Sequence, residues 1–148
     1  MTASGRVLIV DRDPVARSRL DHILTGRGIA SVQADTVDQA IALAGADGAD
    51  IVIINGDSGA TGEAERLTRR LKSQTGTAPI PVIVIGGEAN GADSVLPHAF
   101  KDSELHARLD VFLRLNTMRE ELLRRSASAR KFGVETPPVA SPSSKIDD

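Results

Sequence analysis

Short apolar runs alternate with segments of helical periodicity along most of the chain. The runs are RVLIV, IASVQA, DIVII, PVIVI and SVLP, at residues 6–10, 29–34, 50–54, 81–85 and 94–97. Short runs rich in Val and Ile, separated by helix-length segments, are typical of parallel strands that are buried on both faces. The pattern therefore predicts an α/β domain with a doubly wound, five-stranded parallel sheet.

Capping signals place helices between these runs. Asp13 and Pro14 predict the start of the first helix, and Gly26 predicts its end. Its buried side is expected to carry four apolar residues, Val15, Leu20, Ile23 and Leu24. Three further helices are predicted near 36–45, near 62–74, and from a cap at Asp102 or Ser103 to about residue 130.

The composition limits the classes of function. The 148 residues suit one domain, and a net charge of −2 shows no basic surplus for nucleic acid or anionic lipid, so neither is an expected partner. The chain has no Cys, and its first apolar run is too short for a signal peptide or a membrane span. We therefore expect a soluble cytoplasmic protein.

The end of the sequence differs from the rest. Residues 132–148, FGVETPPVASPSSKIDD, are rich in Pro and Ser and lack apolar periodicity, which is typical of a disordered tail or linker. The predicted organisation is a domain over 1–115, an extension of the last helix over 116–131, and this tail.

Four segments resemble a known family. VLIVDRDPVAR, DIVIIN, PVIVIGG and GADSVLPHAF are similar, in order, to the strand-end motifs of response-regulator receiver domains over about residues 5–115. The resemblance implies a flavodoxin-like sheet of order 2-1-3-4-5. It also implies phosphorelay chemistry: an acidic pair holds Mg²⁺, an aspartate after the third strand takes a phosphoryl group from a histidine kinase, and a Ser or Thr and a Lys contact that group.

Most of the residues implied by the resemblance are replaced. Asp11 matches the first acid, but Arg12 stands for the second acid, Asn55 for the phosphoacceptor, Gly86 for the hydroxyl residue and His98 for the lysine. An amide cannot form an acyl phosphate. The sequence thus predicts a vestigial pocket that needs no cofactor, with Mg²⁺ binding lost or weak. Arg12 is expected to offset Asp11 if their side chains meet.

Other interpretations of these positions stay open. Asp57 lies two residues beyond Asn55, on the same side of an extended chain, and could serve as a substitute acceptor in a phosphorylated receiver. Asn55 could instead cap loop amides, and His98 could pack or sense pH. His22 and His106 have no ligand partner at i+4 and are expected on the surface. A flavodoxin-like enzyme or nucleotide binder is disfavoured because no P-loop is present.

The segment between the fourth and fifth runs is short. Residues 87–93, GEANGAD, hold two glycines in seven residues, which disfavours a stable helix. We therefore expect the family's fourth helix to be shortened or missing. The sheet face near the fourth and fifth strands would then be partly bare, with Val95 at the position of the family's switch aromatic. A trans peptide is expected between His98 and Ala99.

The last predicted helix carries two apolar stripes. Leu105, Leu109, Phe112 and Asn116 lie on one side and are expected on the sheet, whereas the second stripe has the 4-3-4 spacing of coiled-coil core positions. The members of the second stripe are Val111, Leu115, Met118 and Leu122. It could also fold back over the missing helix or be a frayed extension.

These features predict a pseudo-receiver, a non-enzymatic regulatory or dimerisation module of two-component type. It would form a homodimer or bind a partner protein through the last helix and the open sheet region. Residues 113–125, LRLNTMREELLRR, are also similar to the helix that leads into diguanylate cyclase domains, which implies such an output domain as a candidate partner.

Overall fold

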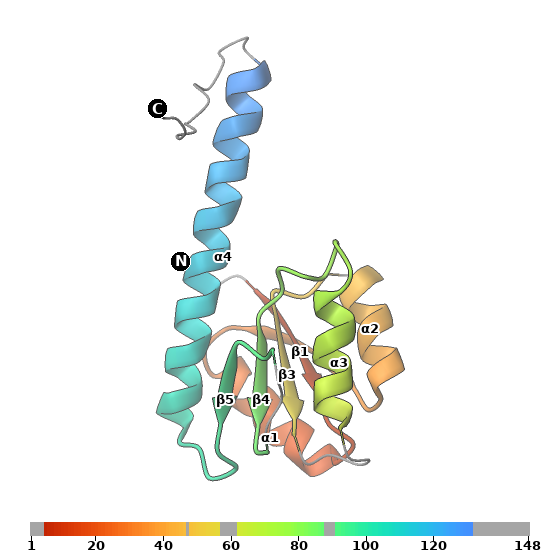
Figure 1. The fold of residues 1–148 in the computed structure, drawn as a ribbon. Helices are drawn as coiled ribbons and strands as arrows, with labels where there is room; N and C mark the ends of the chain where they lie inside the picture. Colours follow the sequence, from red (N-terminus) through yellow and green to blue (C-terminus); the bar gives the residue numbers. More distant parts are fainter. Residues whose placement is uncertain (1–4, 47, 57–61, 88–90, 132–148) are drawn as a thin grey trace, which may run out of the picture. The chain divides into compact units, whose positions relative to one another are not determined.

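The strands and helices follow the predicted alternation. The computed structural model describes residues 5–46, 48–56, 62–87 and 91–131. The strands are β1 (Arg6–Val10), β2 (Ala30–Ala34), β3 (Ile51–Asn55), β4 (Val82–Ile85) and β5 (Ser94–Leu96). The helices are α1 (Pro14–Thr25), α2 (Val37–Ala46), α3 (Glu63–Lys72) and α4 (Asp102–Lys131). The strands form one parallel sheet of order β2-β1-β3-β4-β5 (Figure 1), so the predicted fold class is confirmed.

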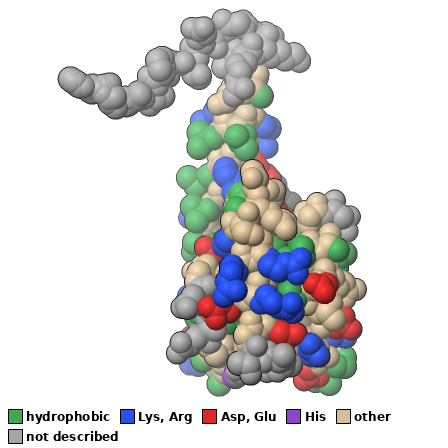
Figure 2. Space-filling model, turned by 45° about the vertical axis from the view of Figure 1, so that its right-hand side comes forward, with side chains coloured by type: hydrophobic (Ala, Val, Ile, Leu, Met, Phe, Trp, Pro, Cys, Tyr) green, Lys and Arg blue, Asp and Glu red, His purple; other side chains and the backbone are tan. Residues whose placement is uncertain are grey.

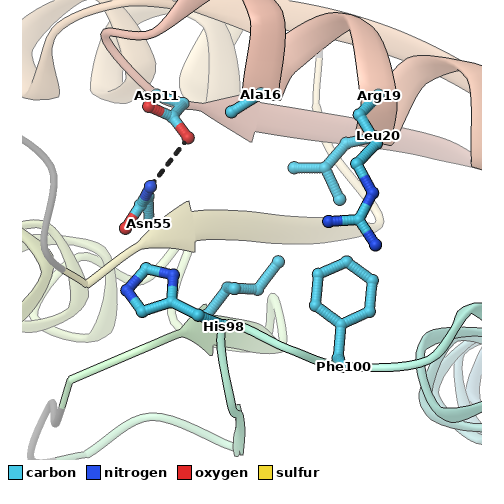
Figure 3. A pocket seen from close by; sticks show the side chains of 8 residues that line it. Asp11, Ala16, Arg19, Leu20, Asn55, His98 and Phe100 are labelled. Atoms are coloured by element: carbon cyan, nitrogen blue, oxygen red, sulfur yellow. Dashed lines mark hydrogen bonds between the residues drawn. The ribbon is translucent and has the colours of Figure 1, made fainter.

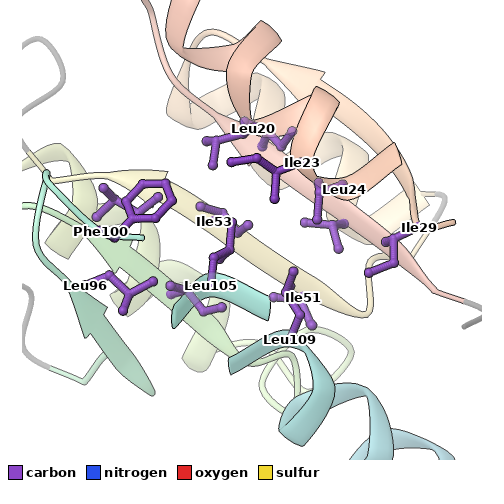
Figure 4. Close-up of a cluster of buried hydrophobic side chains, with 14 of the residues drawn as sticks. Leu20, Ile23, Leu24, Ile29, Ile51, Ile53, Leu96, Phe100, Leu105 and Leu109 are labelled. Carbon is purple, nitrogen blue, oxygen red and sulfur yellow. The ribbon is translucent and has the colours of Figure 1, made fainter. Parts of the chain in front are cut away.

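The two faces of the sheet bury alternate residues of the same strands. Ile9, Ile53 and Ile83 belong to a cluster that includes side chains from α1 and from α4 up to Leu113 (Figure 4). Leu8 and its alternating neighbours on β3 and β4 belong to a second cluster, with α2 and α3. Because neighbouring residues of a strand point to opposite faces, both faces need apolar side chains.

The chain forms two compact units, Met1–Leu113 and Arg114–Asp148. The sheet and its packed helices belong to the first unit. The described part of the second unit is the remainder of α4, to Lys131. The predicted tail over 132–148 lies outside the described residues. Within the described ranges, no helix is both long and apolar enough to cross a membrane.

Helix α1 has the predicted N-terminal cap, but one residue of its predicted buried face is exposed. The Asp13 side chain accepts a hydrogen bond from the Val15 backbone N–H at 3.0 Å. Val15 itself is 75% exposed, so its predicted burial is wrong. At 100° per residue it lies about 140° from Leu20 and 180° from Leu24, which are buried.

The start of α4 is capped differently from the prediction. Asp102 and Ser103 both lie inside the first turn of the helix. The Glu104 carboxylate instead accepts a hydrogen bond from the Lys101 backbone N–H at 2.8 Å, and the Glu104 N–H donates to the Lys101 carbonyl at 2.9 Å. This reciprocal pair satisfies the backbone at the helix start.

The link from β4 to β5 is short and is held by a lysine. Its described residues, 86–87 and 91–93, form turns, and the predicted absence of the family's fourth helix is confirmed for them. Lys72 Nζ at the end of α3 donates to the carbonyls of Ala78 and Ile80, at 3.3 and 2.8 Å, and lies 2.9 Å from Asp93 Oδ2. Asp93 Oδ2 also accepts from the Val82 N–H at 2.7 Å. We call these contacts the Lys72 clamp.

The bare region of the sheet is narrower than predicted. Val84 and Val95 are register partners on β4 and β5. Val84 is fully buried in the cluster that includes Leu67 and Leu71 of α3, whereas Val95 is 46% exposed. Helix α3 therefore closes most of the face that a fourth helix would have covered, and among the described strand residues the exposed apolar side chain there is Val95.

Replacing the clamp lysine should lower stability. In Lys72→Met the carbonyls of Ala78 and Ile80 lose a charged donor and Asp93 loses its counter-ion, so the free energy of unfolding should fall by about 1–3 kcal/mol. Urea unfolding measures it. Lys101→Met, at an exposed lysine, is the control, and an equal effect of the two substitutions would show that the clamp does not stabilise the domain.

Candidate functional site

A pocket lies at the carboxyl-terminal edge of the sheet. Asp11 follows β1, Asn55 ends β3, and His98 follows β5. The pocket has a volume of about 90 Å³, which is room for a few water molecules or a small ion. Its lining comes from α1, from the ends of β3 and β4, and from the segments after β1 and β5 (Figure 3): Asp11, Ala16, Arg19, Leu20, Asn55, Ile85, His98 and Phe100. Three of the predicted site residues are therefore brought together.

Asp11 is held by neutral donors. It is only 3% exposed, and its two carboxylate oxygens accept separate hydrogen bonds. Asn55 Nδ2 donates to Oδ2 at 3.0 Å, and the backbone N–H of Asp13 donates to Oδ1 at 2.9 Å. The Asn55 amide thus joins the end of β3 to the end of β1 through a buried carboxylate. Its role is wider than capping its own loop.

The charge of Arg12 is directed to another acid. Arg12 Nη2 lies 2.6 Å from Glu63 Oε2, at the start of α3. The hydrogen bond to Glu63, and then the charge of that carboxylate, raise the pKa of Arg12 above its ordinary value. The expected balance of Arg12 against Asp11 is therefore replaced by a pair that links the β1–α1 turn to α3. Sequence reasoning missed Glu63, although its place in the first turn of a predicted helix puts it at this edge.

The His98 ring occupies the space where a side chain at position 86 would lie. Gly86 is buried and has φ of 76°, a conformation that L side chains rarely adopt. A Cβ at this position would lie 2.3 Å from Nε2 of His98. Gly56 is constrained by a close backbone contact, because a Cβ there would meet the Gly86 carbonyl oxygen at 2.0 Å. The peptide bond between His98 and Ala99 is trans, as expected.

The other end of the pocket is formed by residues that sequence reasoning missed. The guanidinium carbon of Arg19 lies 4.6 Å from the centroid of the Phe100 ring. In Figure 3 the side chains of Arg19 and Phe100 face each other, and both lie at the end of the pocket away from Asp11. The available signal was Phe100 itself, an aromatic residue four positions after the end of the fifth strand in a chain with only three Phe.

The remaining predicted residues do not extend the site. Asp57 lies outside the described residues. His22 is exposed, as expected, but His106 is half-buried and its Nε2 has no hydrogen-bond partner, so the expectation of a surface residue is wrong for it. His106 lies three residues before the buried Leu109, and residues at this spacing are neighbours on a helix surface, so His106 is partly buried. No group of three metal-ligating side chains occurs in the described part of the chain.

The contact between Gly86 and His98 can be measured against a matched glycine. Gly48 has φ of 74° and no atom within 4 Å of an added Cβ. Gly48→Ala should cost about 1–2 kcal/mol from the backbone alone. Gly86→Ala should cost more, because the His98 ring must also move, and the excess should vanish in a His98→Ala background. Equal costs at the two glycines in chemical denaturation would refute this coupling.

Comparisons with known proteins give one consistent result. No model of a protein family and no curated protein sequence matches the chain. Solved structures do match. The receiver domain of a sensor histidine kinase from Pseudomonas aeruginosa PAO1, which holds a magnesium ion in its active-site cleft, is 20% identical with a TM-score of 0.68 and covers 75% of this chain and 98% of its own.

Two further solved structures also match. A receiver-modulated diguanylate cyclase from Pelobacter carbinolicus is 22% identical with a TM-score of 0.68, covering 79% of this chain and 98% of its own. The receiver domain of an HD domain-containing protein from Pseudomonas fluorescens Pf-5 is 21% identical with a TM-score of 0.70, covering 82% and 95%. Together with the strand order and the pocket at the strand ends, these matches show that the chain has the fold of response-regulator receiver domains.

Proposed function

We propose that the chain is a pseudo-receiver, a cytoplasmic regulatory domain of two-component type that accepts no phosphoryl group and acts through protein contacts. The observation that carries the proposal is the hydrogen bond from Asn55 to Asp11. Asn55 stands where the resemblance places the phosphoacceptor, and a carboxylate oxygen is required there as nucleophile. The amide N–H of Asn55 instead donates a hydrogen bond to the Asp11 carboxylate, which it stabilises without phosphorylation or metal.

The residues at the pocket do not fit Mg²⁺. This ion requires near-octahedral coordination by oxygen ligands, with negative charge nearby. Asp11 supplies one carboxylate, but the Asn55 nitrogen faces it and Arg12 occupies the position of the second acid. The carboxylate of Asp13 caps α1. The described residues thus replace a metal-centred arrangement with hydrogen bonds and an Arg12–Glu63 ion pair.

The contacts of such a module are supported by an exposed apolar surface on α4. The four residues of the predicted second stripe, which we call the α4 stripe, are each more than half exposed: Val111, Leu115, Met118 and Leu122. Exposed aliphatic residues repeated along one helix face favour association with another helix. We infer a homodimer or a partner protein on this stripe, with Val95 as a further contact. An output domain such as a diguanylate cyclase, as in the Pelobacter protein, is a candidate partner.

Treatment with a phosphoryl donor tests the proposal. After incubation with acetyl phosphate and Mg²⁺, intact mass spectrometry of the full chain should show no species heavier by one phosphoryl group. A phosphorylated species that disappears in Asp57→Asn would overturn the proposal in favour of a receiver that uses Asp57 as acceptor. A phosphorylatable receiver domain treated in parallel is the positive control.

Restoring a carboxylate at position 55 tests the arrangement around Asp11. Asn55→Asp removes a donor and puts a second negative charge beside a buried acid, so the free energy of unfolding at neutral pH should fall by about 1–3 kcal/mol. Millimolar Mg²⁺ should recover part of this loss in the variant and leave the wild type unchanged.

The control is Asn116→Asp, the same chemical change at a position where Arg119 Nη2 donates to the side-chain oxygen at 2.8 Å. A carboxylate there keeps its donor, so little loss is expected. Stabilisation of the wild-type protein by Mg²⁺ in thermal unfolding would contradict the proposed loss of the metal site.

A further inference from the structure

The α4 stripe has the spacing of a short two-stranded coiled coil. Its members follow one another at intervals of four, three and four residues, over about 16 Å of helix. Hydrophobic side chains are visible along α4 in Figure 2, with Lys and Arg side chains between them. In heptad terms Val111 and Met118 occupy d positions, and Leu115 and Leu122 occupy a positions.

Charged residues flank the stripe. Arg114 and Glu121 directly precede the a residues and so occupy g positions, whereas Arg119 directly follows Met118 at an e position. All three are exposed. In coiled coils, pairs between such flanking positions set the partner and the orientation. The flanking residues of α4 can therefore distinguish the ways in which two copies could pair.

Parallel pairing is opposed by these charges. In a parallel pair, each g residue lies opposite the e residue five positions on in the other helix. Arg114 would then face Arg119 of the partner subunit, and this repulsion would occur twice because of the two-fold symmetry.

Antiparallel pairing is favoured by the same charges. With Leu115 opposite the partner's Met118 and Val111 opposite the partner's Leu122, all four stripe residues of each copy are buried. The g residues then face each other, so Arg114 meets Glu121 of the partner subunit, again twice. Shifting this register by one heptad would put either Arg114 against Arg114 or Glu121 against Glu121. One antiparallel register therefore combines full burial with opposite charges.

We propose that α4 binds α4 of a second copy of this chain in this antiparallel register. The inference rests on the proposed function, since it names the partner and orientation of the α4 stripe, but it does not depend on the loss of phosphorylation. The apolar stripe supplies the attraction. The pairs of Arg114 with Glu121 stabilise the antiparallel register, and the repulsion between Arg114 and the partner's Arg119 disfavours the parallel arrangement.

Disulfide trapping in the full chain tests the orientation. The chain has no Cys, so Val111→Cys and Leu122→Cys each introduce a single thiol. Oxidation of a mixture of the two variants should give a disulfide-linked heterodimer. Each variant alone should remain uncrosslinked, since its two thiol positions lie about 16 Å apart along the pair and a disulfide requires Cα atoms within about 7 Å.

Charge reversal gives an independent test, because the same substitution should weaken an antiparallel dimer and strengthen a parallel one. Arg114→Glu should raise the dimer dissociation constant about tenfold at low salt, because it creates two like-charged pairs. Combining it with Glu121→Arg should restore wild-type association. In a parallel dimer Arg114→Glu would strengthen association, because it would then attract Arg119. Sedimentation equilibrium on the full chain measures the constants.

Two adjacent leucines provide the control for the apolar contact. Leu122 and Leu123 are 62% and 63% exposed, but only Leu122 lies on the stripe. Leu122→Glu should abolish dimerisation and Leu123→Glu should leave it intact. Homodimeric crosslinks from each single Cys variant would establish parallel pairing and overturn the inference while leaving the proposed function in place. A wild-type protein that is monomeric at about 0.5 mM would overturn self-pairing, whatever the result with acetyl phosphate.

Discussion

Burial of the central strands on both faces is the constraint that organises this domain. The side chains of β3 and β4 have almost no room for polarity, because one set of alternate residues packs on α1 and α4 and the other on α2 and α3. Polar chemistry is therefore confined to the positions where strands end. Asp11 and Asn55 occupy two such ends, and their hydrogen bond is a direct consequence of that confinement.

Charge at this edge is distributed in local pairs. Asp11 is satisfied by an amide and a backbone N–H, and Arg12 pairs with Glu63. Away from this edge, at the other end of α3, Lys72 pairs with Asp93. Each pair joins two elements of secondary structure. A buried carboxylate with two hydrogen bonds is stable without a cation, whereas the same carboxylate next to a second acid is not.

The sequence predicts the sheet well because short Val- and Ile-rich runs separated by helix-length segments leave few alternatives, and the strand order follows from the receiver resemblance. It predicts side-chain pairing less well. Arg12 lies next to Asp11 in the chain but pairs with Glu63, fifty-one residues away, and Val15 satisfies the apolar composition of α1 while facing solvent. The packing of the His98 ring beside Gly86 also depends on the positive φ of Gly86, which composition does not determine. The pairing of Arg12 and the space beside Gly86 depend on long-range geometry, which local propensity does not encode, whereas the outward position of Val15 follows from helical periodicity.

The interlocking of Gly86 and His98 limits the side chains that position 86 accepts. A hydroxyl side chain at position 86 would require a change of the local backbone from its positive φ and displacement of the His98 ring. A carboxylate at position 55 alone would meet neither requirement. The dihedral angle at Gly86 and the position of the His98 ring are therefore coupled, so that a single substitution at either position would leave the other residue in a conformation suited to the original pair.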